Sequence, residues 1–423
     1  MDQPPPQASP PHHRLFFLPS PTHLFKGHST AYTISCLLLL FSFLLLPHFL
    51  TPLQPFLLLR IPRSHDSHPD TACDYTFGRW VWDEARPLDP YTEDCPFLDP
   101  GFQCRRNGRN DSSYLYWRWQ PHGCDLPRFN ASEMLERSRN GKIIFAGDSI
   151  GRNQWESFLC MLAKAVQNKS SIYEKYGNPI TKHKGFLSMV FHDHNLTVEY
   201  YRAPFLAAVG RPPRASPDHV RAAIHLDALH WQCKHWVDAD VLILNAGHWW
   251  NDKKTIDVGL YFQVGEEIQT AMDVKEAFRR TLETVKLWTF NNLHLRKSHV
   301  FFRNHSPIHF SNGTWDNGGS CTAFTEPEKD PAALGPEPWN NRVIADTVEG
   351  MKSGGRKVQL LNITYLTEFR KDAHPSAHRE PGTPTDAPED CSHWCLPGVP
   401  DTWNQLLYAY LLMMEYDTRK KNV

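Results

Sequence analysis

The chain has 423 residues, of which 41% are hydrophobic and 12% aromatic. That much apolar surface is enough to bury a substantial core, which excludes a disordered protein. The 45 Lys and Arg side chains against 46 Asp and Glu give a formal net charge of -1. Because neither sign is in excess, nucleic acid is not an expected partner.

An apolar segment near the amino terminus has the length of a membrane span. No Asp, Glu, Lys or Arg lies between Lys26 and Arg60, and residues 31–50 are largely apolar. This is the length that an α-helix needs to cross a bilayer. We therefore expect a transmembrane anchor there, between a disordered cytosolic tail (1–30) and a stem (51–71). A cleaved signal peptide is the alternative, disfavoured because the apolar block starts late and no small-x-small cleavage site comes after it.

Cysteines and glycosylation signals indicate on which side of the membrane the rest of the chain lies. Nine of the ten cysteines come after the apolar segment, as expected of a disulfide framework in an oxidising compartment. Seven Asn-x-Ser/Thr sequons come after it too, at Asn110, Asn130, Asn168, Asn195, Asn304, Asn312 and Asn362. The two patterns together predict a single-pass type II protein whose folded part is lumenal and glycosylated.

Beyond the stem, the composition changes at about residue 128. Residues 72–128 hold four cysteines and few long apolar runs, which predicts a small disulfide-stapled module packed against the rest of the folded chain. Residues 129–418 alternate short β-branched runs with amphipathic stretches, which predicts an α/β domain with helices flanking a parallel sheet. The predicted strands are 143–146, 241–244, 300–303 and 358–361, the predicted helices 150–166, 272–292 and 402–414, and a hairpin is predicted over 186–201.

A Gly-Asp-Ser sequence ends the first predicted strand. Ser149 stands where that strand gives way to a helix, at the carboxyl edge of the predicted parallel sheet. Such edges bind ligands, and the N–H groups of a helix start can stabilise an oxyanion. Ser149 is thus a candidate nucleophile. The alternative is that Asp148 and Ser149 only cap the helix, which is the commoner role of this pair.

Asp390 and His393 lie three residues apart near the carboxyl end. On a turn they can face the same side, so that the carboxylate holds one imidazole nitrogen and leaves the other free as a base. Ser, Asp, His is a permitted chain order for a hydrolase-type triad. Two alternatives stay open: a zinc site, because Cys391 and Cys395 flank the histidine, and an ordinary surface turn.

The combination of motifs resembles a known superfamily. Gly147-Asp-Ser149 and Asp390-x-x-His393 in one sheet-containing domain resemble the SGNH/GDSL esterases. Longer stretches are similar to the plant trichome birefringence-like family, with its PMR5N and PC-esterase domains, over Cys73 to about Asp417. These stretches are 116–121 (Tyr-Trp-Arg-Trp-Gln-Pro), 147–157, 245–250 (Asn-Ala-Gly-His-Trp-Trp) and 390–398.

The resemblance implies a Golgi polysaccharide O-acetyltransferase. Its acceptor would be a cell-wall glycan, with pectin and its rhamnogalacturonan I part expected first and xylan, mannan or xyloglucan behind. Acetyl-CoA or a derived lumenal donor would be the co-substrate, with a donor-supplying protein as a further partner. We expect no metal and no tightly bound cofactor. A polysaccharide acetylesterase and a non-catalytic pectin-binding protein remain alternatives, because water and a sugar hydroxyl differ only as the second nucleophile.

The oxyanion hole departs from the superfamily pattern. Ordinary SGNH enzymes place an Asn after the Gly-His pair, whereas Trp249 comes after Gly247 and His248 here. We predict that Arg152, one helical turn after the serine, supplies the missing donor beside Gly247. The alternative for Arg152 is an exposed helix residue paired with Glu156 at i,i+4.

Aromatic side chains beside the predicted nucleophile are candidates for binding a sugar. For Trp249 and Trp250, an acceptor-binding role and a core role are expected equally. For Trp117 and Trp119 the core role is favoured. His192, Asp193 and His194 have metal-ligand side chains, but they alternate across a strand, so an exposed hairpin is expected instead (192–194).

The cysteines around His393 are expected to be disulfide-bonded, since a terminal segment otherwise frays and a base that moves by an ångström costs catalysis. By resemblance to the family, the pairs would be Cys73–Cys124, Cys95–Cys160, Cys104–Cys395 and Cys321–Cys391, with Cys233 left over. The third pair would tie the amino-terminal module to the catalytic turn.

Overall fold

The computed structural model of the protein describes residues 73–86 and 91–422, which fall in one compact unit of residues 70–423. The predicted tail, anchor and stem lie outside these described residues. Within the described part, none of the helices has both the length and the apolar character that a membrane crossing requires.

The centre of the fold is a seven-stranded sheet in the order β13-β12-β9-β3-β6-β5-β4. The five strands from β13 to β6 run parallel, and β5 and β4 continue the sheet antiparallel at one edge. The strands are β3 (Lys142–Gly147), β4 (Ile172–Glu174), β5 (Phe186–Phe191), β6 (Leu196–Arg202), β9 (Val241–Asn245), β12 (His299–Arg303) and β13 (Val358–Leu361). The four predicted strands and the predicted hairpin, which is β5 and β6, are confirmed.

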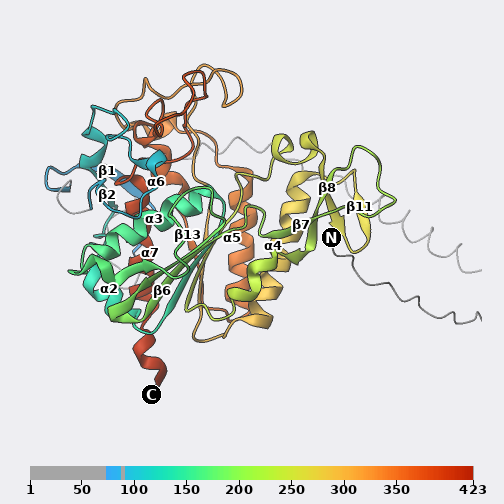
Figure 1. The fold of residues 1–423 in the computed structure, drawn as a ribbon, viewed down its shortest axis with the longest axis horizontal. Helices are drawn as coiled ribbons and strands as arrows, with labels where there is room; N and C mark the ends of the chain where they lie inside the picture. The colour runs from blue at the N-terminus through green and yellow to red at the C-terminus, as the bar shows by residue number, and fades with distance from the viewer. Residues whose placement is uncertain (1–72, 87–90, 423) are drawn as a thin grey trace, which may run out of the picture. The chain divides into compact units, whose positions relative to one another are not determined.

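Helices cover both faces of this sheet. They are α2 (Ala131–Arg137), α3 (Ser149–Ala163), α4 (Val274–Asn292), α5 (Trp339–Ser353), α6 (Thr364–Glu368) and α7 (Val399–Met413). In β3, Ile143 and Phe145 belong to the core shared with α3 and α7, and Ile144 and Ala146 to the core shared with α4 and α5. Successive side chains of a strand point to opposite faces, so a strand covered on both sides is apolar throughout. Figure 1 shows α4 and α5 side by side.

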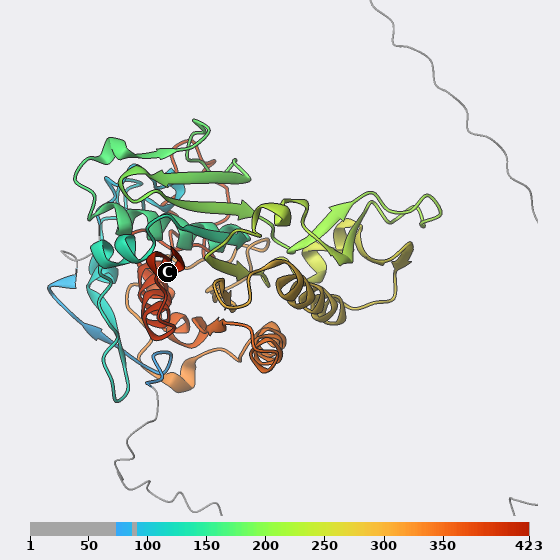
Figure 2. The same ribbon diagram turned by 90° about the horizontal axis from the view of Figure 1, so that it is seen from below.

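A second, four-stranded sheet was not predicted. It has the order β11-β10-β8-β7, with β7 (Ala207–Gly210), β8 (Ala222–Leu229), β10 (Leu260–Val264) and β11 (Glu267–Gln269). It packs against α4, where Thr284 Oγ1 donates to the Leu226 carbonyl at 2.6 Å. Seen from below, its yellow-green strands extend away from the red helix α7 (Figure 2).

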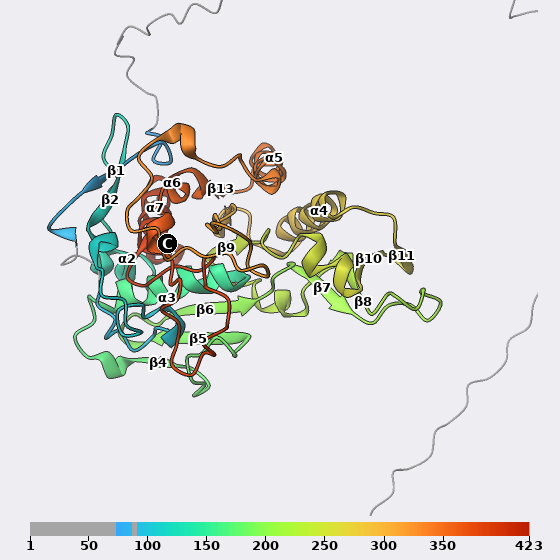
Figure 3. The same cartoon turned by 90° about the horizontal axis from the view of Figure 1, so that it is seen from above.

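The amino-terminal module contains the antiparallel pair β1 (Gly78–Trp82) and β2 (Trp117–Pro121). The prediction that it packs on the α/β domain is confirmed, because its apolar side chains join the core of α3 and α7. Trp80 Nε1 also donates to the Leu366 carbonyl at 2.7 Å. Figure 3 shows β1 and β2 next to the helical layer that contains α6 and α7.

Four disulfides join the same cysteine pairs that the family resemblance implies: Cys73–Cys124, Cys95–Cys160, Cys104–Cys395 and Cys321–Cys391. The second links the module to α3, and the third links it to the segment just after His393. Cys233 has no disulfide partner among the described residues.

Candidate active site

Ser149 begins α3 directly after β3, with Asp148 as the helix N-cap. The Asp148 Oδ1 atom accepts hydrogen bonds from the N–H groups of Ile150 at 2.9 Å and Gly151 at 3.3 Å. Asn245, the last residue of β9, donates its Nδ2 to the same oxygen at 2.6 Å. The alternative of a capping role is therefore true of Asp148, and the cap fixes the turn that presents Ser149.

Both glycines around this turn are required by the close approach of Asn245. A Cβ atom added at Gly147 would lie 2.1 Å from Asn245 Oδ1, and one added at Gly151 would lie 2.0 Å from it. No side chain fits at such distances. The Gly-Asp-Ser-x-Gly spacing is thus required by the packing of Asn245 at the end of the neighbouring strand. This contact was not predicted from the sequence.

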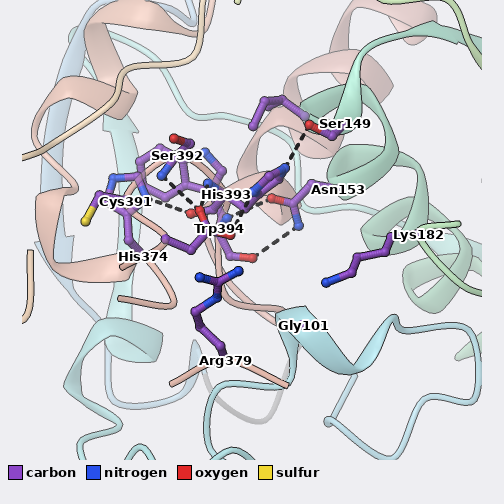
Figure 4. A network of polar contacts seen from close by, with 12 residues as sticks. Gly101, Ser149, Asn153, Lys182, His374, Arg379, Cys391, Ser392, His393 and Trp394 are labelled. Carbon is purple, nitrogen blue, oxygen red and sulfur yellow. Dashed lines mark hydrogen bonds and ion pairs between the residues drawn. The ribbon is translucent and has the colours of Figure 1, made fainter. Parts of the chain in front are cut away.

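The structure brings Ser149, His393 and Asp390 together. His393 Nε2 lies 2.8 Å from Ser149 Oγ, and His393 Nδ1 lies 2.8 Å from Asp390 Oδ2. The other carboxylate oxygen of Asp390 accepts from the backbone N–H groups of Ser392 and His393 at 3.1 and 3.0 Å. Figure 4 shows the imidazole pointing at the serine hydroxyl. This is the chain of contacts that a nucleophile, its base and the orienting acid need.

Asp390 and His393 shift each other's pKa values. Burial alone would raise the pKa of Asp390, but the neighbouring His393 and the hydrogen bonds that the carboxylate accepts hold it far below its usual range. Burial alone would lower the pKa of His393, but the Asp390 carboxylate outweighs it and raises that pKa. Asp390 is therefore ionised and favours the imidazolium that forms when the serine loses its proton.

The turn that carries His393 is held by Asn153 on α3 and by Ser306. Asn153 and Trp394 exchange two hydrogen bonds, at 2.8 Å from the Trp394 N–H to Asn153 Oδ1 and 3.1 Å from Asn153 Nδ2 to the Trp394 carbonyl. The Trp394 indole N–H donates to Ser306 Oγ at 2.9 Å. Asn153, which the sequence analysis did not assign to the site, thus fixes the residue after the histidine relative to the helix of Ser149.

A second histidine supports His393 through its backbone. His374 Nδ1 lies 2.6 Å from the His393 carbonyl oxygen, so that nitrogen carries a proton. The other ring nitrogen of His374 lies 2.8 Å from His309 Nδ1. Burial, and next the nearby His309, hold the pKa of His374 well below its usual value, so the ring is neutral and its Nε2 accepts from His309. Sequence reasoning gave no signal for this pair, because the residues are distant along the chain.

Arg152, the predicted oxyanion donor, is buried on α3. Its Nε donates to Glu156 Oε1 at 2.7 Å, and its Nη1 to the Thr181 carbonyl at 2.6 Å. Among the described residues, none of its hydrogen bonds reaches Ser149 or His393. The i,i+4 pairing with Glu156 is present, yet both side chains are buried rather than exposed. The third guanidinium nitrogen, Nη2, is buried without a hydrogen-bond partner among the described residues, so the role of Arg152 as an oxyanion donor stays a prediction.

Gly247 lies just after β9 with a φ of +146°, and a Cβ there would lie 2.4 Å from Asn340 Nδ2. Next to it, the His248 ring stacks on His305 with centroids 4.1 Å apart. Burial, then the charges of Arg303 and His393, lower the pKa of His248 to about 3. His248 is thus a half-buried, neutral imidazole within the electrostatic reach of His393.

The tryptophans divide between core and surface. Trp250 is only 1% exposed and packs on Phe262 and Phe278, which corrects the prediction that it contacts a sugar. Trp119 is buried as well, in the amino-terminal module. Trp249 is half-buried, with the cations of Arg202 and Lys254 within 6 Å of its ring.

The sulfurs of Cys391 and Cys395, the other ligands of the alternative zinc site at His393, both lie in disulfide bonds. The same holds for the cluster of Cys321, Glu389 and Cys391, whose two sulfurs are bonded to each other. Residues 192–194 form a short turn between β5 and β6, in which His194 Nε2 lies 3.2 Å from Glu136.

The burial of Asn304 contradicts the prediction that this sequon carries a glycan. Asn304 is 3% exposed, and its amide nitrogen donates to Asn362 Oδ1 at 2.7 Å. A glycan attached to that nitrogen would displace this bond within the folded domain. Five others are exposed at the surface: Asn110, Asn130, Asn168, Asn195 and Asn312.

The parallel sheet, the serine at its carboxyl edge and the Ser-His-Asp contacts define a GDSL-type acyl-esterase fold. Residues 126–410 match the GDSL/SGNH-like acyl-esterase family found in Pmr5 and Cas1p, and residues 71–125 match the PMR5 amino-terminal domain. The chain belongs to the trichome birefringence-like branch of this family.

Three Arabidopsis thaliana proteins illustrate the relationship. The chain is 52% identical to trichome birefringence-like 9 over 96% of its own length and all of that protein. It is 42% identical to trichome birefringence-like 6, over 80% of this chain and 70% of that one. It is 38% identical to the protein trichome birefringence, over 81% of this chain and 56% of that one.

Proposed function

We propose that the protein transfers acetyl groups to hydroxyls of a plant cell-wall polysaccharide, with pectin as the first expected acceptor. The observation that carries the proposal is the pair of 2.8 Å contacts that link Ser149 through His393 to Asp390. The acyl-esterase family supplies the reaction class, because ester hydrolysis and acyl transfer share an acyl-enzyme and differ in the second nucleophile.

In the first half-reaction, His393 takes the proton of Ser149 while the serine oxygen attacks the acetyl carbonyl of the donor. The imidazolium then protonates the leaving group, and Ser149 carries the acetyl group as an ester. In the second half, His393 deprotonates a sugar hydroxyl, which attacks that ester and regenerates the free serine. The proposed donors to the oxyanion are the backbone N–H groups of Ser149, at the start of α3, and of Gly247.

The cellular setting is inferred from the amino-terminal segment. We propose a Golgi type II membrane protein with a lumenal catalytic domain and acetyl-CoA or a derived donor as co-substrate. The four disulfides and the exposed sequons support an oxidising, glycosylating compartment.

The test is an assay of the full chain with an acetyl donor and a panel of de-acetylated wall oligosaccharides. We expect a mass gain of one acetyl group on at least one acceptor, abolished by Ser149→Ala. Ser353→Ala, at the exposed end of α5, is the matched control and should keep full activity. Normal turnover by Ser149→Ala would contradict the mechanism. Release of acetate from acetylated polysaccharide without transfer to any acceptor would identify an esterase instead.

A further inference from the structure

Two cations and two indole rings alternate on one surface, which we call the cation–indole surface: Arg202, Trp249, Lys254 and Trp315. Lys254 Nζ lies 4.4 Å from the centroid of the Trp315 ring and 5.6 Å from that of Trp249. On the other side, the Arg202 guanidinium carbon lies 5.7 Å from Trp249. Arg202 is exposed, Trp315 is 45% exposed, and the remaining two are half-buried. The surface is therefore open to a ligand.

Strand register places this surface beside the nucleophile. β6 and β9 are the two neighbours of β3, the strand that leads to Ser149. Arg202 ends β6 opposite Gly147, two residues before the serine. Trp249 comes four residues after Asn245, whose side chain bonds to Asp148. Two of the four side chains thus come from the segments that flank the serine on either side.

The loop of Trp315 is joined to the turn that carries Asp390 and His393. Ser311 and Ser320 bridge the base of this loop, and Cys321 comes directly after it. The Cys321–Cys391 disulfide then joins the loop to the residue after Asp390. The loop that carries Trp315 is therefore linked covalently to the turn of Asp390 and His393, as the segments of Arg202 and Trp249 are linked to the serine by the sheet.

The two cations of this surface lack an acidic partner in the part of the chain that the structure describes. Neither Arg202 nor Lys254 forms an ion pair there with an Asp or Glu, whereas the adjacent Lys253 is paired with Asp316 at 2.5 Å. Cations left unpaired between aromatic faces favour an anionic ligand that also has an apolar face.

We propose that the cation–indole surface binds a uronic acid residue of the acceptor polysaccharide. The indole faces stack on the C–H face of the sugar ring, Lys254 pairs with its carboxylate, and Arg202 receives that carboxylate or the next one along the chain. This inference rests on the proposed function and narrows its acceptor to an acidic glycan. Both galacturonate in a pectin backbone and glucuronate on a xylan present this chemistry.

The test measures binding rather than turnover, so it does not depend on acetyl transfer. The full chain carrying Ser149→Ala is titrated with de-acetylated oligogalacturonides, with the same oligomers fully methyl-esterified, and with glucuronoxylan oligosaccharides. The charge variants Arg202→Gln and Lys254→Gln are compared with Lys253→Gln, a control because its ammonium is already paired. Trp315→Ala tests the stacking.

We expect each charge variant to weaken binding of the free-acid oligomer by roughly 2- to 5-fold, as for one exposed charge pair, and the control by less. Binding of the methyl ester should be weaker from the start and unchanged by either Gln substitution, while Trp315→Ala should weaken both ligands. High salt should remove the preference for the free acid. Preference for the glucuronoxylan arm would place the carboxylate on a side branch, and preference for the oligogalacturonide in the backbone.

Equal affinity for the free-acid and esterified oligomers overturns the uronate assignment, whatever the transfer activity. Loss of affinity in Lys253→Gln equal to that in Lys254→Gln overturns it too. Selective uronate binding by a protein that acetylates no acceptor would instead contradict the proposed function and leave this inference standing.

Discussion

Asp390 shifts the charge state of His393, the residue proposed as the base. Its ionised carboxylate raises the pKa of His393 against the opposing effect of burial. A base works only when neutral, so activity is low where His393 is protonated and rises as the pH passes upward through its raised pKa. Alkaline conditions therefore favour the first proton transfer.

Replacing Asp390 with Asn should change both the rate and its pH dependence. Without the carboxylate, the pKa of His393 falls, so the acid limb of the kcat/KM profile should move to lower pH. The maximum should drop by about 10³- to 10⁴-fold, because the amide does not hold the imidazole in the working tautomer. A pH series on both proteins measures the two effects, and an unmoved acid limb would contradict the assignment of His393 as the base.

His374 should position His393 without taking part in the chemistry. His374→Leu removes the donor to the His393 carbonyl, and we expect roughly a tenfold loss of kcat with little change of KM. His374→Asn should restore most of this loss, since the Asn Nδ2 occupies about the place of the histidine Nδ1. If the two variants lose kcat equally while differing in thermal stability, the residue serves only packing.

At the scale of elements, the start of α3 depends on the end of β9. Asn245 fits between Gly147 and Gly151 only because neither has a side chain, and it bonds to the cap residue Asp148. The start of α3, the end of β9 and Ser149 are thus packed together as one unit. Any change that pushes Asn245 away would misplace Ser149.

Gly151→Ala tests this dependence, with Gly350→Ala in α5 as its control. At Gly151 the new methyl group meets Asn245 at 2.0 Å, whereas at Gly350 the nearest atom is the flexible end of Lys286 at 3.8 Å. We expect the first to destabilise the fold by about 1–3 kcal/mol and to cut kcat. The second should be neutral or stabilise by about 0.5–1 kcal/mol, the usual gain of Ala over Gly in a helix. Denaturant unfolding and steady-state kinetics distinguish the outcomes.

The buried strands and long helices were predictable because their apolar runs are local signals. The helix α5 was not predicted, although its buried Ile344, Val348 and Met351 have helical spacing in the sequence. The four-stranded sheet was harder to predict. Three of its four strands, β7, β10 and β11, have three to five residues, and its parallel pair β8 and β10 is formed by segments separated by β9.

Site residues divide in the same way. Ser149, Asp390 and His393 were found because their motifs are short and ordered along the chain. Asn153, Asn245 and His374 were missed because each acts through a contact across the fold. Trp250 was wrongly assigned to the site, because its position after a strand end suggested a contact with the sugar. Its ring is buried in the core instead.

At the scale of the whole molecule, the amino-terminal module packs against the segments that hold the proposed base. Arg109, in that module, donates to the carbonyl oxygens of Asp372 at 2.7 Å and His374 at 3.1 Å. Phe102 lies with its ring 5.5 Å from that of His393. The module therefore contacts both His393 and the segment of His374 that supports it, and the Cys104–Cys395 disulfide joins it covalently to the turn of His393.

Removing that disulfide should impair catalysis more than stability alone explains. The bond closes a separation of 291 residues and ends two residues after His393. Cys104→Ala with Cys395→Ala should cost about 2–5 kcal/mol of unfolding free energy. It should also lower kcat at temperatures where the protein is still folded, because the base is less firmly held. The matched control removes Cys73–Cys124, which closes a 51-residue separation within the module, and should lose stability while keeping kcat. Equal kcat values for the two double variants at 10 °C would show that the module stabilises the domain without positioning its base.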